Sequence, residues 1–112
     1  MTRPKRLVVK GIGASRGLAG GVAKVVRTRA DSAKMAQGDI MIAVATNPHL
    51  AAAMLKASAI VTEEGGILSH AAIVARELGI PCVVGAERAT AILNDGQRVL
   101  VDGNAGHVYE AD

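Results

Sequence analysis

Aromatic residues are almost absent from this sequence, which has no Phe, no Trp and a single Tyr, Tyr109. Half of its 112 residues are nevertheless hydrophobic and 21% are charged, a composition typical of one folded domain. The core therefore has to be packed from Ala, Val, Ile, Leu and Met. The lack of aromatic side chains also argues against a nucleic-acid partner, because such binding normally combines basic residues with stacking.

Cysteine and long apolar segments are scarce as well. Cys82 is the single cysteine, which excludes an internal disulfide and a multi-cysteine zinc site and predicts a buried thiol. The longest apolar runs, residues 40–45 and 50–55, are far shorter than the roughly 20 residues that span a bilayer. No apolar signal segment follows the N-terminus, so we expect a cytoplasmic protein with no membrane partner. The net charge of +3 is mild, and residues 1–6 are interpreted as a flexible basic tail.

Short β-branched runs between glycine-rich turns predict several strands. The predicted strands are residues 7–9, 22–26, 40–44, 59–62, 82–84, 97–101 and 107–110, with residues 11–21 as an extended connection. Helices are predicted after the cap Asn47, from Ser69 to about Leu78 and near residues 88–93. Two or three helices cannot cover both faces of so many strands, which favours an α/β fold with a mixed sheet over a doubly wound one.

Four familiar chemical motifs do not match. The glycines of residues 11–17 follow the pattern G-x-G-x-x-x-G, which is not the dinucleotide-binding spacing, and no Gly-Lys pair forms a Walker A loop. Ser69 and His70 are neighbours on a helix, about 100° apart, which is a poor geometry for a nucleophile and its base. His49, His70 and His107 are not spaced like zinc ligands.

Residues 62–76 combine a double glycine with a histidine in the first turn of a helix. The positive end of the helix and its free N–H groups favour an anion there, and a neutral imidazole is nucleophilic. His70 is therefore a candidate nucleophile or phosphate carrier, with a capped structural histidine as the alternative. The candidate supporting groups are the backbone of Gly65 and Gly66 and the side chains of Thr62, Ser69 and Arg76.

The periodicity of the same helix predicts which residues it buries. At 100° per residue, Ala71, Val74, Ala75 and Leu78 share one arc and are the expected core face. Ile73 lies on the adjacent flank with His70. Two interpretations of Ile73 stay open, a docking contact for a partner and a residue packed under the loop of residues 63–68.

The segment Gly65-Gly-Ile-Leu-Ser-His70-Ala-Ala-Ile-Val-Ala-Arg76-Glu-Leu-Gly-Ile-Pro81-Cys-Val-Val-Gly85 closely resembles the phosphohistidine signature of phosphoenolpyruvate-utilizing enzymes. The segments Gly13-Ala-Ser-Arg-Gly-Leu-Ala-Gly20 and Val101-Asp-Gly-Asn-Ala-Gly106-His-Val also fit this family. The resemblance implies the swivelling β/β/α phosphohistidine domain of phosphoenolpyruvate synthase and pyruvate phosphate dikinase, a single mobile domain over residues 1–112. Three residues depart from the family pattern, in which Pro, Asp and Thr are usual: Arg16, Glu63 and Leu68.

By resemblance, we expect a phosphotransferase component in which His70 carries a phosphoryl group. In the family an ATP-grasp domain phosphorylates the histidine, and a second domain exchanges the group with pyruvate and phosphoenolpyruvate. Protein partners of both types are therefore expected, with Mg²⁺ and ATP on a partner and neither a cofactor nor a metal bound by this chain. The alternative is a non-catalytic module derived from the mobile domain, which binds a partner or a phosphorylated ligand without turnover; Arg16 and Leu68 keep this alternative open.

Overall fold

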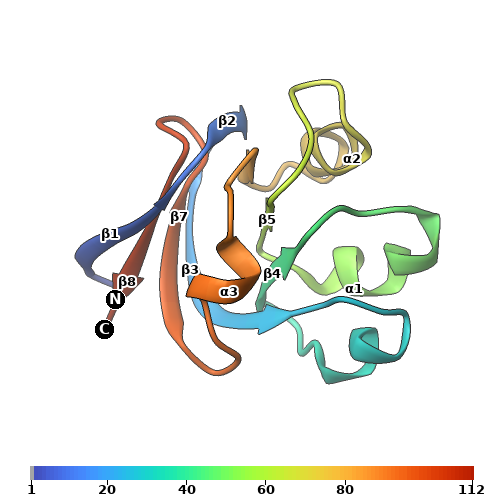
Figure 1. Cartoon of the computed structure of the whole chain (residues 1–112), viewed down its shortest axis with the longest axis horizontal. Coiled ribbons are helices and arrows are strands. Elements are labelled where there is room, and N and C mark those ends of the chain that lie inside the picture. Colours follow the sequence, from blue (N-terminus) through green and yellow to red (C-terminus); the bar gives the residue numbers. More distant parts are fainter. Residues whose placement is uncertain (1) are drawn as a thin grey trace.

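The computed structural model describes residues 2–112, which fold into two layers of strands and one layer of helices (Figure 1). The strands are β1 (Pro4–Lys10), β2 (Ile12–Ser15), β3 (Leu18–Val25), β4 (Ile40–Ala43), β5 (Ala59–Thr62), β6 (Cys82–Val84), β7 (Arg98–Asp102) and β8 (His107–Ala111). The helical segments are the 3-10 helices η1 (Ala30–Lys34) and η2 (Pro48–Leu50) and the α-helices α1 (Ala51–Lys56), α2 (His70–Leu78) and α3 (Ala89–Ile92). No helix in this part of the chain is long and apolar enough to cross a bilayer.

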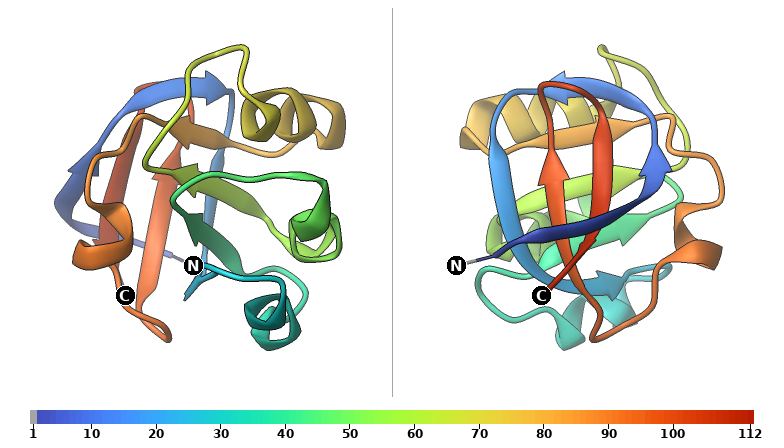
Figure 2. Two further views of the ribbon diagram at one scale, coloured as in Figure 1. Left: turned by 45° about the vertical axis from the view of Figure 1, so that its right-hand side comes forward. Right: turned by 90° about the vertical axis from the view of Figure 1, so that its left-hand side faces the viewer.

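The strand order is β1-β8-β7-β3-β4-β5-β6-β2, and β3 belongs to both strand layers. Residues 18–22 of β3 pair antiparallel with β7, and residues 23–25 pair parallel with β4. Strands β4, β5 and β6 are parallel, whereas β2 runs antiparallel to β6 at the far edge. Figure 2 shows α1 and α2 together on one side of the parallel strands. The predicted α/β fold with a mixed sheet in a β/β/α arrangement is confirmed.

Buried residues form two apolar clusters, one on each face of the parallel strands. Ile40 and Ile42 of β4 belong to the cluster shared with β7 and β8, whereas Met41 and Ala43 belong to the cluster shared with α1 and α2. A strand that is covered on both faces needs apolar residues at every position. This explains why residues 40–43 are a continuous apolar run instead of an alternating one.

Small residues line the face of α2 that packs on the sheet. Ala71, Ala72 and Ala75 are at most 2% exposed, so the helix approaches the strands closely and no large ring is needed to fill the space. Cys82 of β6 is completely buried, as expected. Burial raises the pKa of its thiol to about 12, although the positive charge of Arg76 acts in the opposite direction.

The core face of α2 is rotated relative to the one that the helical periodicity predicted. Ala72 does not belong to the predicted core arc but is fully buried, whereas Leu78 belongs to that arc and is 38% exposed. Leu78 lies at the end of the helix, where Gly79 turns the chain away with a φ of +70°. Ile73 is 45% exposed, so it is not enclosed by the preceding loop.

We expected a flexible tail over residues 1–6. This prediction is wrong for residues 4–6, which belong to β1. Pro4 begins this strand, which pairs with β8, while Met1 lies outside the described residues. Two of the basic side chains, Lys5 and Arg6, are paired with acidic ones from the C-terminal end of the chain. Lys5 contacts Asp112 at 3.2 Å and Arg6 contacts Glu110 at 2.9 Å. Figure 1 shows β1 and β8 side by side.

Residues 11–21 are also more regular than predicted. Instead of an extended connection they contain β2 and the first half of β3, separated at Gly17, whose φ is +124°. The glycines are required by close crossings of backbone. A Cβ atom on Gly13 would collide with the carbonyl oxygen of Gly103, in the turn between β7 and β8. Sequence-local patterns do not reveal such crossings, because the partners are about 90 residues apart in the chain.

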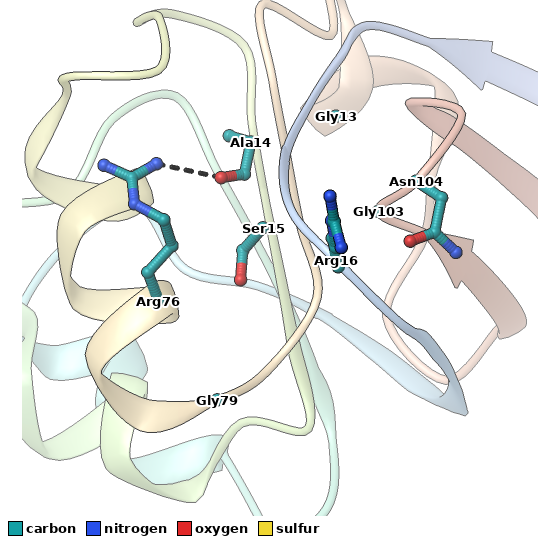
Figure 3. Close-up of a pocket in the computed structure, with 8 residues that line it drawn as sticks. All are labelled: Gly13, Ala14, Ser15, Arg16, Arg76, Gly79, Gly103 and Asn104. Carbon is teal, nitrogen blue, oxygen red and sulfur yellow. Dashed lines mark hydrogen bonds between the residues drawn. The ribbon is translucent and has the colours of Figure 1, made fainter.

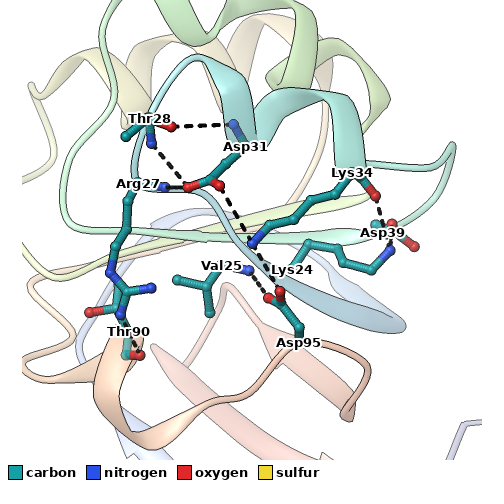
Figure 4. Close-up of polar contacts among 9 residues, drawn as sticks. All are labelled: Lys24, Val25, Arg27, Thr28, Asp31, Lys34, Asp39, Thr90 and Asp95. Atoms are coloured by element: carbon teal, nitrogen blue, oxygen red, sulfur yellow. Dashed lines mark hydrogen bonds and ion pairs between the residues drawn. The ribbon is translucent and has the colours of Figure 1, made fainter.

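A polar network fastens η1 and the turn before β7 to the central strands (Figure 4). Lys24 Nζ lies 2.8 Å from Asp39 Oδ2, and Lys34 Nζ lies 2.9 Å from Asp95 Oδ2. The backbone N–H of Val25 donates to Asp95 Oδ1 at 2.6 Å. These bonds hold the end of β3 against the start of β7, at the end of the molecule away from α2.

Candidate functional site

His70 is the first residue of α2, and Ser69 is the N-cap, as predicted. The Ser69 hydroxyl accepts from the backbone N–H of Ala72 at 3.4 Å, and the Ser69 carbonyl accepts from the N–H of Ile73 at 3.0 Å. The Ser69 N–H in turn donates to the Gly66 carbonyl at 3.0 Å. These bonds set the point where the helix begins and therefore set the position of His70.

The loop before α2 depends on one of its two glycines. Gly65 has a φ of +103°, and a Cβ atom there would lie 2.8 Å from Ser69 Cβ. Gly66 has open space around it. Thr62 is fully buried, and its hydroxyl donates to the Glu64 carbonyl at 2.8 Å. The Thr62 hydroxyl thus shapes the loop that leads to Gly65.

Thr46 contacts the imidazole of His70 directly. Its Oγ1 lies 2.9 Å from His70 Nδ1, which ties the ring to the segment that follows β4. When Nδ1 carries the ring proton, it donates to Thr46, and the lone pair of Nε2 is available. In that tautomer, Nε2 is the ring nitrogen that can act as a nucleophile.

A small pocket of about 170 Å³ opens beside the imidazole. Its lining residues come from the segments that follow β4 and β5 and from the start of α2: Ala45, Thr46, Glu64, Gly65, Ser69, His70 and Ala71. Within residues 2–112, the backbone N–H groups of His70 and Ala71 have no hydrogen-bond partner. Free N–H groups at the positive end of a helix attract an anion. The pocket beside His70 therefore suits a bound anion.

Glu63 attaches this loop to α3. Its carboxylate accepts from the hydroxyl of Thr90 and, at 2.8 Å, from the backbone N–H of Thr90. These two hydrogen bonds, helped by the more distant charges of Arg27 and Arg88, hold the pKa of Glu63 below its usual value. Glu63 stands where the resembling family usually has Asp, and here its carboxylate joins the loop to Thr90 of α3.

Arg76 is not brought to His70. It lies six residues further along the helix, and its Nη1 donates to the carbonyl oxygen of Ala14 at 2.9 Å. There it lines a second, larger cleft, which has no residue in common with the pocket beside His70 (Figure 3). The structure therefore gathers Gly65, Ser69 and His70 at one end of α2 and leaves Arg76 at the other.

Thr46 is the functional residue that sequence reasoning missed. It is 24 residues before His70 in the chain and belongs to none of the motifs described above. A usable signal did exist, because it closely follows the buried strand β4. Polar residues after parallel strands gather at the carboxyl edge of the sheet, where sites commonly form.

Comparison with known proteins finds relatives over almost the whole chain. Residues 35–106 match the family described as "PEP-utilising enzyme, mobile domain". The chain is 51% identical over 108 residues to a probable phosphoenolpyruvate synthase from Methanothermobacter thermautotrophicus, covering 96% of this chain and 16% of that protein. It is 47% identical over 104 residues to a pyruvate kinase from Geobacillus stearothermophilus, covering 92% of this chain and 18% of that protein.

A solved structure shows the same fold. An NMR solution structure of Enzyme I superposes with a TM-score of 0.61 at 33% identity, covering 70% of this chain and 33% of that one. The chain thus spans less than a fifth of the length of either relative named above and a third of the solved one. The match over residues 35–106 covers well over half of the sequence, and the chain belongs to the family of mobile domains of PEP-utilising enzymes.

Proposed function

We propose that this domain is a phosphoryl carrier and that Nε2 of His70 holds the phosphoryl group. The observation that carries the proposal is the 2.9 Å contact between Thr46 Oγ1 and His70 Nδ1, which leaves Nε2 for chemistry. Because Nδ1 keeps its proton in both states, the same hydrogen bond serves the free and the phosphorylated ring. The carrier therefore needs no rearrangement of its imidazole between loading and unloading.

The two transfer steps use the same atoms in opposite directions. On loading, the Nε2 lone pair attacks phosphorus and forms an N–P bond, while the P–O bond to the donor's leaving group breaks. On unloading, an acceptor oxygen forms a new P–O bond, and the electron pair of the N–P bond returns to Nε2. Positioning and charge stabilisation dominate such transfers, and the N–H groups of His70 and Ala71 supply donors for the phosphoryl oxygens.

We further propose two kinds of protein partner. The donor is an ATP-grasp-type protein or domain that holds ATP and Mg²⁺, and the acceptor is a protein or domain that binds pyruvate or phosphoenolpyruvate. The names of the relatives, phosphoenolpyruvate synthase and pyruvate kinase, support these substrates. His70 is half-buried at the start of α2, and in this proposal swivelling of the domain brings it to each partner in turn.

A non-catalytic module is the second candidate, and Leu68 is the observation that favours it. This side chain is 79% exposed next to the pocket and replaces a hydroxyl residue that is usual in the family. In this version the domain binds its partner or a phosphorylated ligand, but His70 is never phosphorylated.

Sequential transfer between separated partners tests the proposal. The chain is incubated with ATP, Mg²⁺ and the separately expressed nucleotide-binding part of a phosphoenolpyruvate synthase, purified, and then mixed with the remaining part and pyruvate. A carrier gains the mass of one phosphoryl group in the first step and forms an equivalent amount of phosphoenolpyruvate in the second. Binding to the partner without any mass gain would support the non-catalytic module instead.

A further inference from the structure

The larger cleft lies at the end of α2 away from His70 and has a volume of about 580 Å³. Three segments form it: β2 with the turn that follows, the last turns of α2 and the turn between β7 and β8 (Figure 3). The lining residues are Gly13, Ala14, Ser15, Arg16, Arg76, Gly79, Gly103 and Asn104. A cleft of this volume is within the range of small-molecule sites.

Hydrogen-bond donors face the cleft from different segments. Arg76 is fixed by the bond from its Nη1 to Ala14, and its other N–H groups are left over. The backbone N–H of Gly17 donates to Asn104 Oδ1 at 3.2 Å, so the NH₂ group of this amide remains a donor. Arg16 adds a second, exposed guanidinium. Figure 3 shows Arg76 on one side of the cleft and Arg16 with Asn104 on the other.

Negative charge does not balance these two arginines. None of the eight lining residues is acidic, and within residues 2–112 neither arginine forms an ion pair. Asp102 is the carboxylate in the neighbouring turn, but its Oδ1 accepts from the N–H groups of Asn104 and Ala105 at 2.9 and 3.1 Å. Its Oδ1 is therefore held by the turn, and Asp102 does not line the cleft.

The carboxyl end of α2 also borders the cleft, and its carbonyl groups would repel an anion if they were free. Two of them are occupied. The Arg76 carbonyl accepts from the N–H of Gly79 at 3.3 Å, and the Ala75 carbonyl accepts from the N–H of Ile80 at 3.0 Å. Arg16 and Arg76 are the charged side chains among the residues that line the cleft.

We propose that this cleft binds the phosphate group of a small phosphorylated molecule, at a site separate from His70. Donors that converge from separate segments suit a tetrahedral oxyanion, whereas one guanidinium already satisfies a planar carboxylate. The volume exceeds that of a single phosphate ion, which leaves room for the remainder of a larger ligand. Arg16 replaces the Pro that is usual in the resembling family, so this chain carries a donor there that the family pattern lacks.

An NMR titration of the chain with inorganic pyrophosphate, AMP, adenosine and malonate tests the proposal. We expect pyrophosphate and AMP to shift the backbone amides of Gly13, Gly17 and Asn104, with no comparable shifts from adenosine or malonate. Tighter binding of AMP than of pyrophosphate would assign the site to a nucleotide, and the reverse would assign it to free phosphate anions. Malonate binding as tight as that of pyrophosphate would overturn the proposal, as would the absence of shifts at millimolar pyrophosphate.

Matched variants identify the side chains. Arg16→Gln removes a charge without removing any hydrogen bond of the fold, and we expect it to weaken binding about tenfold or more, the usual effect of losing one charge-assisted hydrogen bond. Arg98→Gln, an exposed arginine at the other end of β7, is the control and should bind normally. Unchanged affinity in Arg16→Gln would contradict the proposal. Phosphorylation of His70 should be equal in both variants, which separates this site from the carrier function.

Discussion

Thr46 Oγ1 lies 2.9 Å from His70 Nδ1, and this contact joins two segments that are 24 residues apart in the chain. We expect Thr46→Val to slow phosphorylation of His70 by about fivefold, since a hydrogen bond of this kind contributes about 1 kcal/mol. Reaction with phosphoramidate, a small chemical donor, followed by intact mass measures the rate without a partner. Thr46→Ser keeps the hydroxyl and should react at the wild-type rate. Equal rates for all three proteins would show that Thr46 does not position the ring.

The two glycines before α2 offer an internal comparison. Gly65→Ala should lower the free energy of unfolding by about 2 kcal/mol, because a side chain at a φ of +103° is strained and meets Ser69. Gly66→Ala has open space and should change stability by less than about 0.5 kcal/mol. Urea denaturation measures both values. Equal destabilisation by the two substitutions would contradict the geometry of this loop.

Ile73 is 45% exposed on the first turns of α2, close in sequence to His70, and we expect it to contact the phosphoryl donor protein. Ile73→Glu should slow transfer from the nucleotide-binding partner by about tenfold, as for a central interface residue, and leave the melting temperature nearly unchanged. The control is Leu78→Glu, at the far end of the same helix, where 38% of the side chain is exposed. Labelling by phosphoramidate should be equal in both variants. An unfolded Ile73→Glu protein, or one with normal transfer, would rule out the docking contact.

Asp95 gives the stability of the fold a specific pH dependence. The N–H of Val25, and then the ammonium of Lys34, hold the pKa of Asp95 below its ordinary value of 3.8. A carboxyl with a lowered pKa in the folded state stabilises the protein above the unfolded pKa, and this contribution is lost as the pH falls through the folded pKa. We therefore expect Asp95→Asn to be less stable than wild type at pH 7 and to lose less of its remaining stability on acidification.

Urea denaturation at pH 7 and pH 3 tests this expectation. Glu87→Gln is the matched control, because Glu87 is exposed and its carboxylate makes no hydrogen bond or ion pair with residues 2–112. Its stability should follow wild type at both pH values. A parallel loss of stability in wild type and Asp95→Asn on acidification would show that the bonds to Val25 and Lys34 contribute nothing to the pH dependence.

Local sequence signals predicted the start of α2 and its end. The cap Ser69, the stop Gly79 and the double glycine each act within a few residues, so the position of His70 could be inferred without a structure. Contacts between segments that are distant in the chain could not be inferred in this way. Thr46 reaches His70 because β4 and β5 pair in parallel, and β2 forms because it pairs with β6 about 70 residues later. Arg76 was expected near the phosphate, but helical geometry turns it away from His70 towards Ala14.

The nitrogen that carries the phosphoryl group is the most direct test of the carrier proposal. The chain, phosphorylated by ATP, Mg²⁺ and the nucleotide-binding partner, is examined by heteronuclear NMR that couples phosphorus to the imidazole nitrogens. We predict one acid-labile phosphoryl group on Nε2 of His70, lost completely in a folded His70→Ala protein and retained when His49 or His107 is replaced by Ala. Three results would contradict the account. They are a phosphoryl group on Nδ1 of His70, a phosphoryl group on another histidine, and unchanged phosphorylation of the His70→Ala protein.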